Sequence, residues 1–597
     1  MTTKLNVRRR ILPLIVFILI ILPGLRAAEV DAPQAEAVVS ALETYYGPGV
    51  DQSRTYVGSE ICLACHPDQD QWRTSMHATG FKITSTDAFS MQDKFGVVVD
   101  YDGNGVDDFK QGLDFNQISS VFDKYKPNAP VLGYDENRGY TFTIGQVTHD
   151  SRFAYGGSGL YKQRFVVKIP TVDGPGGYGK GHYVGPIQYN EVTSEYVAYH
   201  PEDWWAADGT PHFTPATTMS DAGAKGRSFD KKCSGCHFTG LAVSKSAEGE
   251  WTAAAPPAIL PFPESPHYYD MNGDGLPEEI NTGCERCHGP GSRHVLNRGD
   301  PEKIINPNSD LTTTQANQIC GGCHSRGKSL PDGVHDFPYD ETTNEPYAFN
   351  LGEELYDRFW RDSHGLWPDG KSSRQHHQQY QDFLNAHKEG MEFDEGVRCF
   401  DCHDVHVDNL KHIRPVMTVQ GTDGGEVAIQ TKMEDNSMCL ACHAGFEPFE
   451  ALKREDIVDI DANLDRIASA VEQHSFHSYN PDRTVGLSRC TECHMGHLAK
   501  SAVAYDIPAH TFEVVPPSRT LAYLDQGSMP NSCAARCHRP LAPLFGLPQD
   551  DSLTNWTEPS DIRLAEWLKI FYGPDGIWWK ETVDAPGGPG GESDSGQ

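Results

Sequence analysis

Residues 398–406 read RCFDCHDVH: two cysteines three positions apart, a histidine directly after the second, and another histidine three residues further on. Cysteine pairs at this spacing occur in disulfide scaffolds, zinc sites and redox-active dithiols as well as in haem attachment sites. The number of such pairs in the chain, and the residue that stands directly after each pair, separate these alternatives.

The sixteen cysteines form eight pairs, and a histidine follows each pair directly. A disulfide scaffold does not require that histidine, a zinc site needs two pairs per metal, and a thioredoxin-like dithiol would occur once. In c-type haem attachment, two thiols add to the porphyrin vinyl groups and the next residue ligates the iron. We therefore predict eight covalent haem c groups. Their attachment residues are Cys62, Cys65, His66, Cys233, Cys236, His237, Cys284, Cys287, His288, Cys320, Cys323, His324, Cys399, Cys402, His403, Cys439, Cys442, His443, Cys490, Cys493, His494, Cys533, Cys537 and His538.

The eighth motif departs from the pattern. In NSCAARCH (531–538), the two cysteines stand one residue further apart than in the other seven motifs. An extra residue between the thiols can be looped out without moving the histidine away from the ring. We therefore expect this motif to attach a haem as well.

Eighteen histidines lie outside the motifs, and bis-histidine ligation of eight irons would require eight of them. His406 and His497 each follow a motif histidine by three residues, so they stay on the near side of their own haem. We expect each of them to ligate a neighbouring haem, while His403 holds the iron of its own.

Two helix-like stretches supply further candidates. The segment 374–388 has no helix breaker, and its histidines His376 and His387 would share one helical face with about 16 Å between them along the axis. They would therefore serve two haems. An apolar stripe from Ile457 onward runs to His474, and His477 lies one turn on. We expect one of these two histidines to ligate iron and prefer His477. The predicted set of second ligands is His77, His294, His376, His387, His406, His477, His497 and His510.

The N-terminus and the net charge indicate where the protein works. Residues 1–28 combine a basic start, a short apolar run and small residues, which is typical of a cleaved signal peptide. The alternative is an uncleaved anchor helix. Cleavage would change the formal charge from −33 to −38, because five basic residues and no acidic ones are lost. Such acidity argues against nucleic acid and anionic lipid as partners. We expect an exported protein, periplasmic or extracellular, without a membrane span.

Five stretches resemble the multihaem cytochrome c superfamily that contains hydroxylamine oxidoreductase, octahaem tetrathionate reductase and the haem nitrite reductases. The resemblance covers most of residues 55–100 and 230–580. It implies a mainly α fold with long irregular loops, organised around eight closely packed covalent haems. Two features depart from it: there is no CxxCK motif, and no tyrosine stands in a recognisable crosslinking motif. The matching stretches are ICLACHPDQDQWRTSMHA (61–78), GCERCHGPGSRHV (283–295), ICGGCHSRG (319–327), RCFDCHDVH (398–406) and CTECHMGH with DIPAHTF (490–497 and 506–512).

A long segment without cysteine separates the first and second motifs. It contains strand-like runs, GYTFTIG (139–145) and KQRFVVKIP (162–170), among glycine-rich turns. These runs predict a β-rich insert. The expected organisation is a signal peptide (1–28), a first haem segment (29–90), the insert (91–230), a haem-packed helical core (231–580) and a disordered tail (581–597).

Two acidic loops match the first nine positions of a calcium-binding loop, DYDGNGVDD (100–108) and DMNGDGLPE (270–278), although both lack the final bidentate glutamate. They make calcium a second candidate cofactor. The alternative is a pair of acidic turns. The candidate ligands are Asp100, Asp102, Asn104, Asp108, Asp270, Asn272, Asp274 and Glu278.

The ligand supply leaves three functions open. If every iron has two histidine ligands, the protein carries electrons between redox partner proteins, other cytochromes among them. If one iron is open, it is an oxidoreductase for a small nitrogen or sulfur compound such as hydroxylamine, nitrite or tetrathionate. The third function is that of a homo-oligomer or extracellular filament subunit. We favour electron transfer and assign no catalytic residue.

Overall fold

The computed structural model separates into two compact units, each described by itself. Unit 1 comprises residues 1–323, 327–363 and 405–408, and unit 2 comprises 324–326, 364–404 and 409–597. The predicted signal peptide (1–28) and the predicted disordered tail (581–597) both lie outside the described residues. The structure describes residues 54–84, 99–157, 160–255, 268–271, 278–363, 365–386, 396–432, 435–480, 488–503, 505–539 and 559–572.

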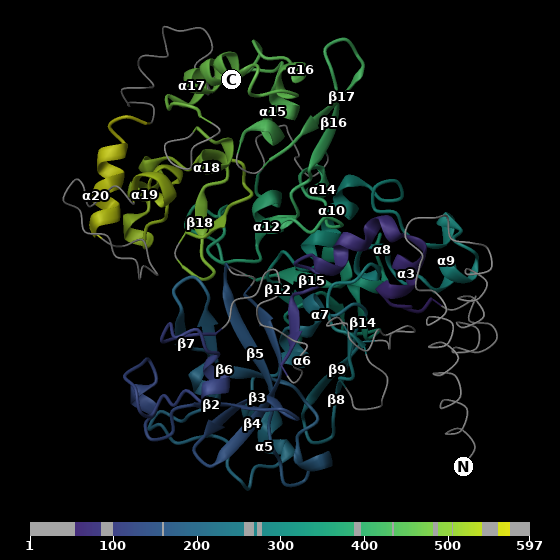
Figure 1. The fold of residues 1–597 in the computed structure, drawn as a ribbon, viewed down its shortest axis with the longest axis vertical. Coiled ribbons are helices and arrows are strands. Elements are labelled where there is room, and N and C mark those ends of the chain that lie inside the picture. The colour runs from purple at the N-terminus through teal and green to yellow at the C-terminus, as the bar shows by residue number, and fades with distance from the viewer. Residues whose placement is uncertain are drawn as a thin grey trace. The chain divides into compact units, whose positions relative to one another are not determined.

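A seven-stranded antiparallel sheet dominates unit 1 (Figure 1). Six strands follow one another in the order β2-β3-β4-β5-β6-β7, and β1 pairs with the far end of β4, where Phe81 lies opposite Tyr155. All seven strands lie between the first and second cysteine motifs. They are β1 (Phe81–Ile83), β2 (Val131–Asp135), β3 (Gly139–Ile144), β4 (Val147–Gly156), β5 (Lys162–Lys168), β6 (Tyr183–Asn190) and β7 (Glu195–Ala198).

Both faces of this sheet are buried. Side chains of a strand alternate between the two faces, and each set packs into a core of its own. Ala154 and Phe165 pack into one core, together with Phe109 and Trp205. The residues next to them in the chain, such as Tyr155 and Val166, pack into a second core with Phe229 and Phe238. Cys233 and Cys236 pack against this second core, so the sheet supports the second cysteine motif.

The prediction of a mainly α fold is wrong: the structure is 31% helix and 21% strand. The helices that carry the motifs are short, because one turn suffices to bring two cysteines and a histidine to one side. A glycine in a left-handed conformation follows one of them directly, at Gly289 (φ 74°). The motif helices are α3 (Ser59–Cys65), α7 (Ser234–His237), α8 (Glu285–His288), α10 (Thr313–Gly321), α14 (Cys399–Cys402), α15 (Ser437–His443), α18 (Cys490–His494) and η10 (Ala534–His538).

The remaining helices are equally brief, and the longest within the described ranges is α17, with 12 residues. No helix in those ranges is both long enough and apolar enough to span a membrane. These helices are α4 (Asp108–Gln111), α5 (Met219–Lys225), α6 (Phe229–Lys232), α9 (Ser292–Leu296), α11 (Leu355–Arg358), α12 (Gln379–Leu384), α16 (Arg454–Ile457), α17 (Leu464–Ser475), α19 (Pro517–Ala522) and α20 (Pro559–Leu568).

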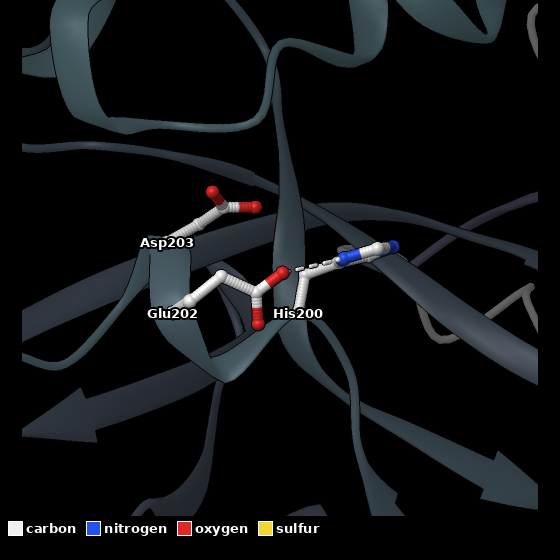
Figure 2. Close-up of side chains that lie close together, drawn as sticks. All are labelled: His200, Glu202 and Asp203. Atoms are coloured by element: carbon white, nitrogen blue, oxygen red, sulfur yellow. Dashed lines mark hydrogen bonds and ion pairs between the residues drawn. The ribbon is translucent and has the colours of Figure 1, made fainter. Parts of the chain in front are cut away.

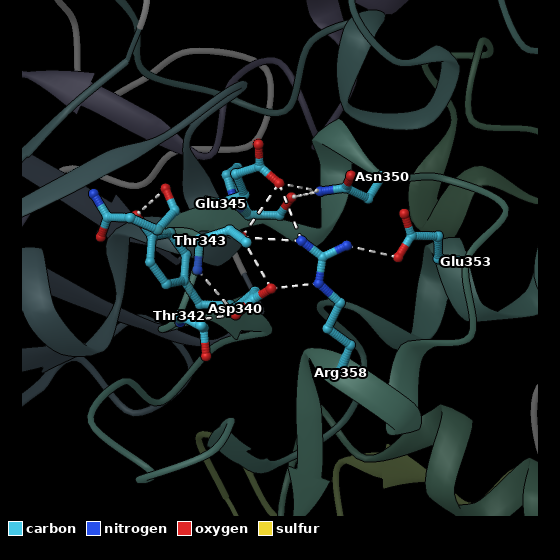
Figure 3. A network of polar contacts seen from close by, with 10 residues as sticks. Asp340, Thr342, Thr343, Glu345, Asn350, Glu353 and Arg358 are labelled. Atoms are coloured by element: carbon cyan, nitrogen blue, oxygen red, sulfur yellow. Dashed lines mark hydrogen bonds and ion pairs between the residues drawn. The ribbon is translucent and has the colours of Figure 1, made fainter.

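Two-stranded ribbons account for the rest of the strands, and an ion-pair network holds one of them in place (Figure 3). Arg358 of α11 contacts Asp340 and also pairs with Glu345 at 3.3 Å and Glu353 at 2.9 Å. The network therefore fixes β13–β14 against α11. The ribbons are β8–β9 (Ala242–Lys245, Trp251–Ala254), β10–β11 (Tyr268–Tyr269, Glu278–Glu279), β12–β15 (Gly327–Ser329, Trp360–Asp362), β13–β14 (Tyr339–Asp340, Glu345–Pro346), β16–β17 (Val416–Gln420, Glu426–Gln430) and β18–β19 (His497–Ala499, Ile507–Pro508).

In unit 2, the apolar stripe predicted as one helix is divided between α16 and α17 with turns between them. Ile457, Ile467 and Val471 still share one core with Leu440 of α15. Phe476, in a left-handed conformation (φ 56°), ends α17 between the two candidate histidines of this segment.

Candidate haem sites

Each of the eight motifs occupies about one helical turn, and none of the sixteen cysteines, all of which lie in described residues, forms a disulfide. The thiols are therefore free for attachment. In the eighth motif the extra residue is wound into a π-helical turn, η10, rather than looped out. A π-turn holds one residue more between hydrogen-bonded groups than an α-turn. Cys533 and Cys537 thus remain about one turn apart despite their wider spacing.

Five motif histidines lie opposite a second histidine. An iron held by two imidazole nitrogens at about 2 Å each would separate the two ring centres by roughly 6 Å. All five observed separations have that size. They are 6.2 Å for His66–His294, 6.3 Å for His288–His406, 6.4 Å for His403–His510, 5.9 Å for His474–His494 and 6.2 Å for His477–His538.

Backbone carbonyls orient the rings in these pairs. The Nδ1 atom lies 2.8 Å from the Ile305 carbonyl in His288, 2.9 Å from the Asp300 carbonyl in His294, and 2.9 Å from the Lys411 carbonyl in His403. A carbonyl oxygen only accepts, so Nδ1 carries the proton and Nε2 keeps its lone pair. Each ring therefore offers Nε2 as a ligand toward the opposite histidine.

Burial favours the neutral form of four imidazoles in these pairs. It lowers the pKa of His474 to about 4 and that of His510 to about 3. Burial also lowers the pKa of His288, and it does the same for the pKa of His403. A neutral imidazole is the form that ligates a metal. Burial therefore favours the ligating form of these four rings.

Three of the five pairs join a motif histidine to a histidine that follows a different, later motif. His294 follows the third motif but lies against His66 of the first. His406 follows the fifth motif and lies against His288 of the third. His510 follows the seventh motif and lies against His403 of the fifth. Each of these three pairs therefore ties one motif to a later part of the chain, whereas His474 and His477 precede the motif histidines that they face.

His474 and His477 are both placed in such pairs, whereas the sequence led us to expect only one of them. The left-handed Phe476 separates them, so that His474 faces His494 and His477 faces His538. The helical stripe drew attention to both residues. Only the break in the helix, which the sequence does not reveal, sends them in two directions.

Other predicted second ligands lie elsewhere. His497 has the Tyr505 carbonyl oxygen 2.8 Å from Nδ1 and an Arg536 nitrogen 2.9 Å from Nε2. His376 lies before α12, which begins at Gln379, so it is not part of a helix as predicted for residues 374–388. Its ring lies 4.3 Å from that of His377. His77 lies half-buried in the turn before β1. His387 lies outside the described residues.

Three motif histidines have other surroundings. The rings of Phe81, Tyr155 and Phe229 lie 4.7, 5.6 and 6.5 Å from His237, whose pKa burial lowers to about 4. His324 has Gln379 Oε1 3.2 Å from its Nδ1. Burial lowers the pKa of His443.

Cysteines of different motifs also meet. A side-chain hydrogen bond to Cys284 raises the pKa of Cys62, and burial raises it further. The same two causes raise the pKa of Cys236, which is hydrogen-bonded to Cys323, and the pKa of Cys490, which is hydrogen-bonded to Cys439. These contacts bring the first motif to the third, the second to the fourth, and the sixth to the seventh.

The calcium prediction remains untested. In the first loop, Asp100, Asp102 and Asp108 have carboxylate oxygens within 4.8 Å of one another, and the backbone N–H of Asn104 donates to Asp100 and Asp102. Burial raises the pKa of Asp108 to about 6, despite hydrogen bonds from the Tyr196 hydroxyl and the Tyr101 N–H. In the second loop, Asp270 and Glu278 are described, whereas Asn272 and Asp274 lie outside the described residues.

A second cluster of potential metal ligands consists of His200, Glu202 and Asp203 (Figure 2). These side chains already make hydrogen bonds and ion pairs to protein groups. His200 Nδ1 lies 3.0 Å from Glu202 Oε1, and Asp203 accepts a hydrogen bond from Arg227 at 2.9 Å. We assign no metal to this cluster.

No family model and no curated protein matches the chain. Two solved structures are similar to it. The crystal structure of the outer cell wall cytochrome OcwA has a TM-score of 0.43 and 20% sequence identity, over 80% of this chain and 83% of that chain. The undecahaem cytochrome from the S-layer of Carboxydothermus ferrireducens has a TM-score of 0.33 and 14% identity, over 91% of this chain and 66% of that one.

Proposed function

We propose that this chain is an exported octahaem c-type cytochrome that transfers electrons along closely packed, mostly bis-histidine haems. The observation that carries the proposal is the set of five opposed histidine pairs, each of which includes the histidine of a cysteine motif. When bound, each haem supplies a reversible one-electron iron couple. Its site of action would be the periplasm or the cell exterior, with other cytochromes as redox partners.

The residues around the pairs suit electron transfer better than catalysis. The two opposed imidazoles of each pair would both hold the iron of an attached haem, and a substrate would then find no free ligand position there. The carbonyls of Ile305 and Asp300 hold the rings of His288 and His294 through Nδ1. A ligand held in this way moves little when the charge on the iron changes, which favours rapid electron exchange.

The contacts between motifs support electron transfer between neighbouring haems within unit 1. Cys62 meets Cys284, and Cys236 meets Cys323. Because a thioether bond joins each cysteine to the edge of its haem, the attached edges of these haems would be neighbours. Packing of this kind is what electron transfer between cofactors requires.

A second candidate function rests on the second motif. Within the described ranges, the rings against His237 are those of Phe81, Tyr155 and Phe229, and none belongs to a second histidine. This arrangement favours an iron with one open position at this motif. The chain would then be an oxidoreductase for a small nitrogen or sulfur compound.

The test is spectroscopic. The purified holoprotein is analysed for covalent haem by intact mass and by the pyridine haemochrome assay. Low-temperature EPR of the oxidised protein is then recorded before and after addition of cyanide, nitrite or hydroxylamine. Eight haems with only low-spin signals that the ligands leave unchanged would support the electron carrier. A high-spin signal that shifts with ligand would favour the oxidoreductase, and a protein without covalent haem would overturn both.

A further inference from the structure

An arginine lies buried among three of the cysteine motifs. Arg286 is the residue before the second cysteine of the third motif, CERCH, and its relative exposure is 6%. Its Nη2 lies 3.3 Å from the sulfur of Cys323 in the fourth motif. Arginine keeps its positive charge in any protein environment, so this position holds a permanent buried charge.

The equivalent residue of the eighth motif is very different. Arg536 also stands directly before the second cysteine, but its side chain is 57% exposed and lies 3.6 Å from Glu492. Water and an acidic neighbour screen that charge. The motif position alone therefore does not bury an arginine. Arg286 is buried because of the residues that surround it.

Arg286 lies close to three motifs. It belongs to the third motif, and its guanidinium contacts Cys323 of the fourth. The Cys323 sulfur in turn lies 3.7 Å from the carbonyl oxygen of Cys236 in the second motif. The buried charge is therefore near the second, third and fourth motifs.

Within the described parts of the chain, no carboxylate pairs with this charge at close range. Among the described residues, none forms an ion pair with Arg286 within 4.0 Å. The adjacent Glu285 is fully buried and accepts hydrogen bonds from the backbone N–H groups of Val57, Gly58 and Gly291 at 2.7–2.9 Å. Its carboxylate is therefore occupied elsewhere.

We propose that Arg286 raises the reduction potential of the haem attached at Cys320 and Cys323, so that electrons collect there. The inference rests on the proposed function. Reduction removes one positive charge from the iron, so a nearby buried cation stabilises the reduced state, and low dielectric surroundings strengthen the effect. Arg286 would raise the potentials of the haems of the second and third motifs less, because its guanidinium donates its hydrogen bond to Cys323 of the fourth.

The experiment compares the holoprotein with Arg286→Gln and Arg286→Lys in EPR-monitored potentiometric titrations, with dithionite as the reductant. Arg286→Gln removes the charge, and Arg286→Lys retains it. Lys124→Gln removes an exposed charge from the same unit and serves as the control. Covalent haem is counted in every variant before titration.

We expect Arg286→Gln to retain eight haems and to lower the potential of one haem by about 59 mV or more, a tenfold change in its ratio of reduced to oxidised form. Arg286→Lys should restore most of the shift, and Lys124→Gln should leave all potentials unchanged. Eight haems with unchanged potentials in Arg286→Gln would overturn the inference but leave the proposed function intact.

If Arg286→Gln fails to attach all eight haems, Arg286→Met is titrated in its place. Methionine also removes the charge and has an unbranched apolar side chain. If both variants lose haem, the inference is also overturned, because Arg286 would then act in assembly rather than on potential. Absence of covalent haem from the unmodified protein would instead contradict the proposed function itself.

Discussion

The imidazole of His294 lies 6.2 Å, ring centre to ring centre, from that of His66 in the first motif, and the Asp300 carbonyl fixes its tautomer. Proximity in the sequence would pair His294 with His288, only six residues before it. His288 instead faces His406. The second ligands are therefore distributed by the fold and not by distance along the chain.

Replacement of His294 should open one iron. We expect His294→Ala to retain eight covalent haems but to convert one of them from low spin to high spin, because the cysteines and His66 still hold that haem. EPR and cyanide binding measure the change. His200→Ala, which alters a half-buried histidine outside the ring pairs that is paired with Glu202, is the control. A wholly low-spin His294→Ala variant would contradict the pairing with His66.

The neighbours His474 and His477 should behave as independent ligands. Each single alanine variant is expected to yield one high-spin haem, and the double variant two, because the two rings face different motif histidines. Magnetic circular dichroism counts the high-spin haems. A His474→Ala variant with unchanged spectra would restore the simpler prediction of one ligand in this segment.

The eighth motif should attach haem despite its wider spacing. The π-helical turn keeps Cys533 and Cys537 about one turn apart. We expect the double variant Cys533→Ser, Cys537→Ser to carry seven covalent haems by intact mass. A double variant whose mass still corresponds to eight haems would show that the motif takes no part in attachment.

The Arg358 network should give a pH-dependent contribution to stability. Burial raises the pKa of Asp340, but hydrogen bonds from Arg358 and Thr343 outweigh it, and the pKa falls to about 2. A lowered pKa stabilises the fold above the ordinary value near 3.8, and that contribution is lost as the pH falls toward 2. We expect Asp340→Asn to reduce the free energy of unfolding by about 2 kcal/mol at pH 7 and by less at pH 3.

Chemical denaturation followed by circular dichroism measures these differences. Glu353→Gln removes an acid of the same network whose side chain is 48% exposed. Its effect should stay below about 1 kcal/mol at pH 7, as for other exposed pairs. Equal effects of the two variants would contradict a special role for the buried Asp340.

The sequence predicted local features well and long-range ones poorly. The runs around Phe142 and Phe165 lie in strands β3 and β5. Strand formation of this kind depends on the alternation of neighbouring side chains, which can be seen in the sequence itself. The mainly α fold was wrong, because the resemblance that implied it could not convey how short the motif helices are or how much sheet the insert adds.

The ligand set illustrates the same limit. A single left-handed residue, Phe476, directs two nearby histidines to different partners, and His377 (φ 61°) precedes α12 and leaves His376 outside it. Backbone conformations of this kind are rare for such residues and have no signature in the sequence. The pairing of His294 with His66 likewise depends on the packing of unit 1, which no local pattern encodes.

The cross-motif pairs also impose an order on biosynthesis. A ribosome makes the chain from its N-terminus, so His66 exists well before His294, and His403 well before His510. A haem attached early would wait with one face exposed until the later segment arrived and folded onto it. Premature termination between these residues would therefore yield a fragment in which the early haem lacks the second histidine that faces it in the full chain.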